Sequence, residues 1–175
     1  MKKLYVDNKK FYSEMVKYKT SVDSAERNLK EKPPVSDYIG KCFHDIAIGL
    51  SFRPNFINYT YKDEMILDAI ENCITYCSNF DPSKSKNPFS YFTQIVYYAF
   101  VRRIEKEKKH NYVKHKLTAN LLEKMSTSND IDNHDYIMSV SEFMKENSVI
   151  DAFEEKMKEK NKNIKKKSTL EKFME

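Results

Sequence analysis

Residues 89–109 carry the side chains of this sequence best suited to chemistry with another molecule. Drawn as a helix, the stretch has aromatic and apolar residues on most sides, and basic residues follow at its end. Exposed rings can stack on unpaired nucleic-acid bases. Neighbouring cations can hold phosphates and make binding depend on salt; here they are Arg102, Arg103, Lys106, Lys108 and Lys109. A central helix buried on most sides would show the same pattern, so the residues alone leave both interpretations open.

An acidic amphipathic helix is predicted just before this stretch, over residues 62–79. Its predicted apolar face consists of Met65, Ile66, Ala69, Ile70, Cys73, Ile74 and Cys77. Glu64, Asp68 and Glu71 share the other face at helical spacing. Such a face suits a basic protein partner, and it is equally typical of an ordinary solvated surface.

The fold class expected from composition is all-α. The chain has only 2 Gly and 5 Pro in 175 residues, and it has no alternating β-branched runs. Asp7 is expected to cap a first helix that ends near Leu29. Either Ser36 or Asp37 is expected to cap a second helix, which ends before Pro54.

The aromatic helix is expected to begin at Asn87 and Pro88, an N-cap followed by proline at the first helical position. It is expected to continue past Arg103 into the basic segment. Residues 126–135 are predicted to form a polar loop. A further helix is predicted over residues 136–157, where the apolar pattern is irregular.

Composition and charge limit the classes of function. The net charge of +5 includes lysine-rich stretches at residues 106–116 and 156–167, which favour a nucleic-acid or acidic partner. No apolar run approaches the ~20 residues of a membrane span, and the first residues lack a signal-peptide core. The 3 cysteines are therefore expected to be reduced thiols in a cytoplasmic protein.

Metal and catalytic motifs are not expected. Cys42, His44, Cys73 and Cys77 could be grouped as zinc ligands, but the cysteines lie on predicted apolar faces and lack a CxxC turn, which favours core thiols. The acidic loop at residues 130–135 has no framework to hold a metal. No phosphate-binding loop, HExxH or nucleophile elbow occurs, so neither a cofactor nor an enzymatic activity is expected.

Two segments carry a resemblance to a known family. EMILDAIENCITYCSNFD and NPFSYFTQIVYYAFVRRI, on either side of a polar turn, resemble region 2 of bacterial sigma factors. The chain also resembles the late-transcription sigma factors of T-even-type bacteriophages at YVDNKKF, DYIG, IAIGLSFRPNF and YKDEMILDAIE. This similarity is collinear up to about residue 116 and is more specific than a short motif.

The resemblance implies a compact helical bundle and a role in transcription initiation. The sigma-like domain would span residues 1–116, with its core at 61–109. A less defined helical extension would follow at 117–160, and a basic tether with a clamp-binding motif at 161–175. Such a protein would bind the core RNA polymerase of an infected bacterium, in the cytoplasm, and direct it to A/T-rich phage late promoters.

The resemblance also implies roles for individual residues. Those that fall where sigma factors contact the clamp helices of the polymerase β′ subunit are Glu64, Asp68 and Glu71. Those that fall where a flipped adenine of a minus-ten-type promoter element is held are Tyr91, Phe92, Gln94 and Ile95. Further along the same DNA-reading helix lie Tyr98, Arg102 and Arg103.

Two features bear on how such a factor would open DNA. Primary sigma factors carry two tryptophans where this chain has Ile95 and Val96, and the chain contains no Trp. Melting would therefore rely on Tyr and Phe or on an activator. In the phage family a DNA sliding clamp binds a C-terminal peptide, whose implied contacts here are Leu170, Phe173 and Met174. Whether a late-transcription coactivator is also required stays open.

Other functions remain open beside the sigma role. A helical DNA-binding protein that never contacts polymerase would use the aromatic and basic residues alone. A coactivator that binds polymerase or the clamp, without promoter specificity, would use the acidic helix or the C-terminal peptide. A small nuclease is the least favoured of the alternatives.

Overall fold

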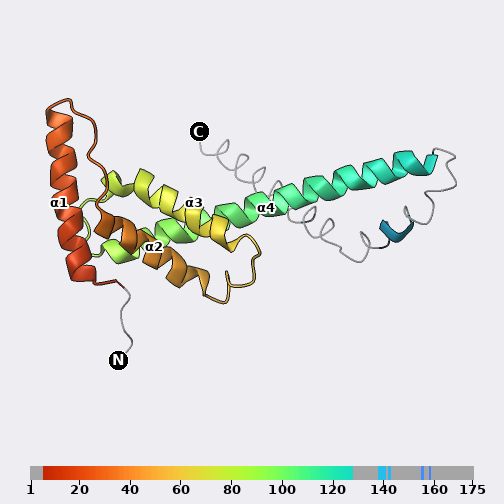
Figure 1. Cartoon of the computed structure of the whole chain (residues 1–175), viewed down its shortest axis with the longest axis horizontal. Coiled ribbons are helices and arrows are strands. Elements are labelled where there is room, and N and C mark those ends of the chain that lie inside the picture. Colours follow the sequence, from red (N-terminus) through yellow and green to blue (C-terminus); the bar gives the residue numbers. More distant parts are fainter. Residues whose placement is uncertain (1–5, 128–137, 141, 143–154, 156–157, 159–175) are drawn as a thin grey trace, which may run out of the picture. The chain divides into compact units, whose positions relative to one another are not determined.

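The computed structural model describes residues 6–127, 138–140, 142, 155 and 158 (Figure 1). The helices whose bounds it describes are α1 (Asn8–Arg27), α2 (Asp37–Ser51), α3 (Lys62–Thr75), the short 3-10 helix η1 (Cys77–Asn79) and α4 (Pro88–Thr127). The described residues contain no strand, which confirms the all-α prediction. None of the helices described is long and apolar enough to cross a membrane.

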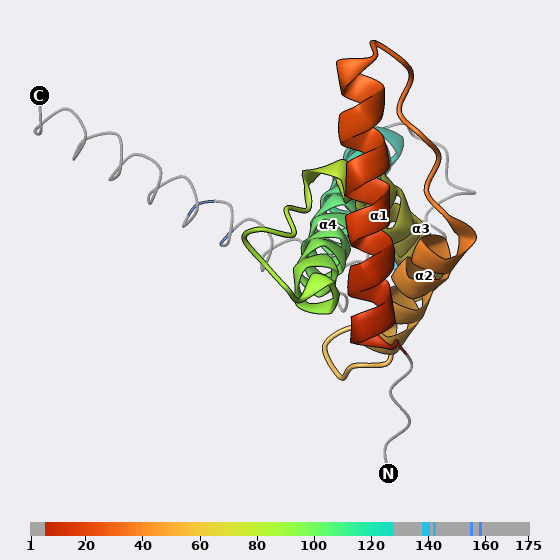
Figure 2. The same ribbon diagram turned by 90° about the vertical axis from the view of Figure 1, so that its left-hand side faces the viewer.

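The chain divides into two compact units, Met1–Ile104 and Glu105–Glu175. The division falls within α4, before the domain boundary expected at residue 116. In the first unit, α2 and α3 lie side by side and α1 runs steeply across their ends (Figures 1 and 2). α1 also contacts α2, η1 and the start of α4, where the ring of Phe11 packs against that of Phe92.

Side chains cap the starts of α1, α2 and α4. The Asp7 carboxylate accepts hydrogen bonds from the backbone N–H groups of Lys9 and Lys10, at 3.0 and 3.3 Å. Ser36, not Asp37, caps α2, since its Oγ accepts from the N–H of Ile39 at 3.4 Å. At the start of α4, Asn87 Oδ1 accepts from the N–H of Ser90 at 3.1 Å. These side chains satisfy N–H groups that a helix cannot pair internally.

The end of α3 differs from the prediction. The α-helix stops at Thr75, and the chain continues as η1, in place of one helix over residues 62–79. Cys77, in η1, is buried, whereas Ile74, in the last turn of α3, is half exposed. The prediction that Ile74 lies on the apolar face was wrong.

The hinge between α3 and α4 is held by α1. Lys19 Nζ donates a hydrogen bond to the carbonyl of Ser78 at 3.0 Å, and the Tyr12 hydroxyl donates to the carbonyl of Pro82 at 3.3 Å. Asn8 Oδ1 accepts from the N–H of Phe89 at 3.3 Å. Contacts so distant in sequence fix where α4 begins, and therefore where its aromatic residues lie.

Most of the second unit lies outside the described residues. α4 continues to Thr127, so residues 126 and 127, expected in a polar loop, are helical. Of the helix predicted over 136–157, the structure describes only 138–140, 142 and 155, all of them helical. The basic tether and the C-terminal peptide lie outside the described residues.

The three cysteines are core thiols, as predicted. Cys42, Cys73 and Cys77 are all buried and unbridged. Burial raises the pKa of Cys73 and of Cys77 from 9.0 to about 12. In the folded protein these thiols therefore stay protonated well into the alkaline range.

Raising the pH should therefore destabilise the fold between about pH 9 and 12. In that window the unfolded chain releases thiol protons that the folded chain keeps, so stability is full below about pH 9 and is lost as the pH approaches 12. Each thiol should lower the free energy of unfolding by up to about 1.4 kcal/mol per pH unit. Urea unfolding from pH 8 to 10.5 measures this slope.

The Cys73→Ala and Cys77→Ala double variant is the control for this slope. Tyrosines also titrate in this range, so the wild-type slope alone does not assign the effect to the thiols. The double variant should show a smaller pH dependence than the wild type. An unchanged slope would contradict the assignment.

Candidate nucleic-acid interface

One buried ring sets the rotation of α4. The ring of Phe92 lies with its centroid 4.5 Å from that of Phe43 in α2, 5.7 Å from Phe11 in α1 and 6.1 Å from Phe80 after η1. Phe92 is completely buried. Because this ring points into the core, the helical period decides which other side chains of α4 face away from it.

Phe92 is therefore a core residue, which corrects its predicted role as a contact to a flipped base. A ring with no exposed surface cannot stack on a ligand without leaving the core. The burial interpretation of the aromatic helix holds for Phe92, Val96 and Phe100. It does not hold for the whole helix, since Tyr98 is 59% exposed and Tyr97 42% exposed.

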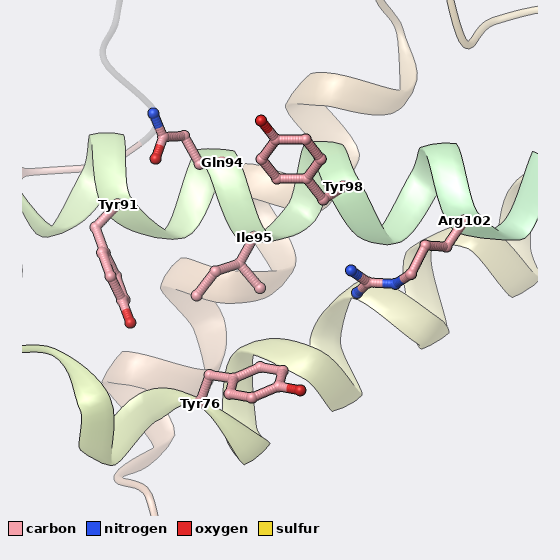
Figure 3. Close-up of a pocket in the computed structure, with 6 residues that line it drawn as sticks. All are labelled: Tyr76, Tyr91, Gln94, Ile95, Tyr98 and Arg102. Carbon is pink, nitrogen blue, oxygen red and sulfur yellow. The ribbon is translucent and has the colours of Figure 1, made fainter. Parts of the chain in front are cut away.

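The side chains next to this buried edge of α4 line a pocket of about 210 Å³ (Figure 3). Its lining residues are Tyr76, Tyr91, Gln94, Ile95, Tyr98 and Arg102. Five of these six are residues that the sequence predicted as DNA contacts. The pocket is smaller than the roughly 300–1,000 Å³ of sites for drug-sized ligands, so it suits a single planar group.

Figure 3 shows how these side chains lie. Tyr91, Ile95 and Arg102 extend from α4 toward the end of α3, where Tyr76 lies, whereas Gln94 and Tyr98 lie along the upper edge of α4 in this view. Three tyrosine rings, an aliphatic side chain, an amide and a guanidinium thus border one space. These are the groups that stack on a base, bond to its edge and hold a phosphate.

Tyr91 is the most firmly fixed ring of the pocket. It makes edge contacts with Phe80 at 5.4 Å and Phe92 at 5.0 Å between ring centroids. Burial raises the pKa of the Tyr91 hydroxyl, and the nearby thiols Cys77 and Cys73 raise it further. The hydroxyl is therefore neutral at physiological pH and can donate a hydrogen bond as well as accept one.

Tyr76 is the site residue that the sequence reasoning missed. It lies directly after α3 and is 45% exposed. The predicted helix over residues 62–79 gave Tyr76 no special place, because its position opposite α4 depends on how α3 lies against α4. The only sequence signal that could have identified Tyr76 is an aromatic residue shortly before a polar turn.

Arg102 and Arg103, both predicted DNA contacts, bind side chains of α3. Arg103 Nη1 lies 3.0 Å and 3.3 Å from the two carboxylate oxygens of Asp68. Arg102 Nη2 donates to Asn72 Oδ1 at 2.8 Å. These contacts join α3 to α4 beside the pocket.

Asp68, predicted to share the polar face of this helix with Glu64 and Glu71, differs from both in its surroundings. Glu64 and Glu71 are exposed, but Asp68 is only partly exposed and pairs with Arg103. The outer face of α3 also carries Leu67, 65% exposed, and Ile74, 50% exposed. The face thus presents two acids and two apolar side chains.

The remaining predicted sites lie in the second unit. Lys106, Lys108 and Lys109 are exposed on α4. Leu170, Phe173 and Met174 lie outside the described residues. Over the part of the chain that the structure describes, no three His, Cys, Asp or Glu side chains come together as metal ligands.

Comparison with known proteins gives no further identification. No protein-family model matches the sequence. No curated protein matches it significantly.

Substitutions at Phe92 and Tyr98 should have different effects on stability, because Phe92 is a core residue and Tyr98 an exposed pocket residue. Phe92→Ala should lower the free energy of unfolding by about 3–5 kcal/mol, because it leaves a cavity among packed rings. Tyr98→Ala should change it by about 0.5 kcal/mol or less, as expected for an exposed surface residue. Urea unfolding of both variants measures the difference, and equal losses would contradict this division of roles.

Proposed function

We propose that this protein is a sigma-like transcription initiation factor of a bacteriophage. It binds the core RNA polymerase of the bacterial host, directs the enzyme to A/T-rich late promoters and helps to open them. The protein catalyses no reaction itself, since nucleotide polymerisation belongs to the polymerase. The resemblance to sigma region 2 is the starting point of this proposal.

The observation that carries the proposal is the composition of the pocket on α4. Tyr91, Gln94, Ile95, Tyr98 and Arg102 were singled out from sequence as DNA contacts, and all five line it. Stacking of a base on an aromatic ring contributes about 1–3 kcal/mol per base. An unpaired base held in this way would favour the open form of a promoter over the paired duplex.

Glu64 and Glu71 are the proposed polymerase contacts on α3. Both are exposed and lie on the same outer face as Leu67 and Ile74. Carboxylates around exposed apolar side chains fit a basic helical surface, because opposite charge speeds encounter and fixes register while apolar burial provides affinity. Asp68 is assigned instead to the contact with Arg103 within the chain.

The basic and C-terminal segments provide the remaining proposed contacts. Lys106, Lys108 and Lys109 would hold DNA phosphates beyond the pocket, which would make binding sensitive to salt. The C-terminal peptide with Leu170, Phe173 and Met174 would bind the phage sliding clamp. A short peptide on a tether can be captured by a groove in this way.

A DNA-binding protein without promoter specificity is the second candidate. It is favoured by the exposed lysines of α4, which would bind any phosphate backbone. Such a protein would need the basic residues but neither Glu64 nor Glu71. A coactivator would show the opposite dependence, since it would need the acidic residues and tolerate loss of the pocket.

Run-off transcription on supercoiled DNA with phage late promoters tests the proposal. Host core polymerase with the wild-type protein should give discrete starts at A/T-rich elements. The Glu64→Lys and Glu71→Lys double variant should reduce these starts by about tenfold or more, because like charges at an interface cost several kcal/mol. Asp68→Lys is less suitable, since it would also break the Arg103 contact.

The Glu26→Lys and Glu31→Lys double variant is the matched control, since it makes the same change of net charge at two exposed acids near the end of α1. It should leave the starts unchanged. Starts that are equally sensitive to both charge reversals would assign the effect to net charge alone. No discrete starts with the wild type, even after adding the phage clamp and its loader, would reject the sigma role.

A further inference from the structure

Two residues one turn apart on α3 hold two successive arginines of α4. Asp68 binds Arg103 through both carboxylate oxygens, and Asn72 binds Arg102 through its amide oxygen. The two α3 side chains differ in one respect that matters for a ligand. The carboxylate neutralises the charge of its arginine, whereas the amide leaves the arginine with its full positive charge.

The amide of Asn72 is fixed by a second hydrogen bond. Its Nδ2 donates to the backbone carbonyl of Asp68, one turn earlier in the same helix. With the nitrogen used in this way, Oδ1 points toward α4 and accepts from Arg102 Nη2. The acceptor for Arg102 is therefore oriented before any ligand arrives.

Arg102 is exposed, and without a partner its long side chain would populate many rotamers. Ordering such a side chain costs up to about 2 kcal/mol. Arg102 borders the pocket together with the rings of Tyr76, Tyr91 and Tyr98 (Figure 3). The guanidinium has five N–H donors, and the bond to Asn72 uses only one of its nitrogens. The others remain suited to an anion at the pocket.

We infer that Asn72 is a positioning residue for a nucleotide site. It holds the Arg102 guanidinium where this group can bind the phosphate next to an unpaired base in the pocket, and it does so without cancelling the charge. Asp68 fixes Arg103 in a structural role, and Arg102 is the arginine that meets the ligand. This inference rests on the proposed function, because it assumes that the pocket takes a DNA base.

Equilibrium binding of fluorescent DNA by the whole chain tests the inference, with and without bacterial core polymerase. The probes are a duplex with one unpaired adenine and the same duplex fully paired. The wild type should prefer the unpaired probe. Arg102→Ala should weaken binding of that probe by roughly tenfold, as expected for a hydrogen bond to a charged group. It should also reduce the salt slope by about 1.

Three further variants examine whether Asn72 acts through Arg102. Asn72→Ala should weaken binding of the unpaired probe by about threefold and keep most of the salt slope, since the charge of Arg102 remains. Asn72→Asp should reduce the slope by about 1, because a carboxylate competes with the phosphate for Arg102. Adding Asn72→Ala to Arg102→Ala should cause no further loss.

Asn79→Ala is the matched control. Asn79 is an exposed asparagine in η1, close to the end of α3. Its substitution should leave affinity and salt slope unchanged. Thermal unfolding of all variants checks that weaker binding does not come from loss of the fold.

Independent, additive losses from Asn72→Ala and Arg102→Ala would overturn the inference. So would the absence of any preference for the unpaired probe, both alone and with polymerase. Promoter-specific starts without this preference would leave the proposed function standing and reject the nucleotide site. The preference with the expected variant pattern, but without promoter-specific starts, would support the site and reject the sigma role.

Discussion

The burial of Phe92 is the constraint on which the candidate site depends. Its ring packs against aromatic rings from α1, α2 and the segment after η1, which are far apart in the sequence. Pairs of this kind contribute about 0.5–1.5 kcal/mol each beyond the area they bury. Once this ring is fixed in the core, α4 has little freedom to rotate, and its other side chains take defined positions.

The pocket follows from this rotation and from the position of the end of α3 beside α4. Tyr91 and Ile95 flank the buried edge of α4, and α3 stops where Tyr76 can face them. Rings and an aliphatic side chain form the walls of the pocket and suit a planar group. A hydroxyl, an amide and a guanidinium at its border can form hydrogen bonds with that group. Neither α3 nor α4 alone would form such a space.

The contacts between α3 and α4 fix the positions of two arginine side chains beside the pocket. Asp68 and Asn72 lie on adjacent turns, and each binds one of two successive arginines. Partly exposed ion pairs contribute little to stability in general. Their effect here is geometric, since they fix long and flexible side chains beside the pocket and distinguish a neutralised arginine from a charged one.

Most helices, several of their caps and most of the core could be predicted from the sequence, because these depend on neighbouring residues and on a period of 3.6. Asp7 and Asn87 cap helices as expected, and the three cysteines are buried. Periodicity could not say which aromatic residue of α4 points inward, because apolar residues lie on most of its sides. Only the tertiary structure decided that Phe92 is core, that Asp68 pairs with Arg103, and that Tyr76 and Asn72 face α4. Those outcomes depend on contacts between segments distant in sequence, which no local pattern records.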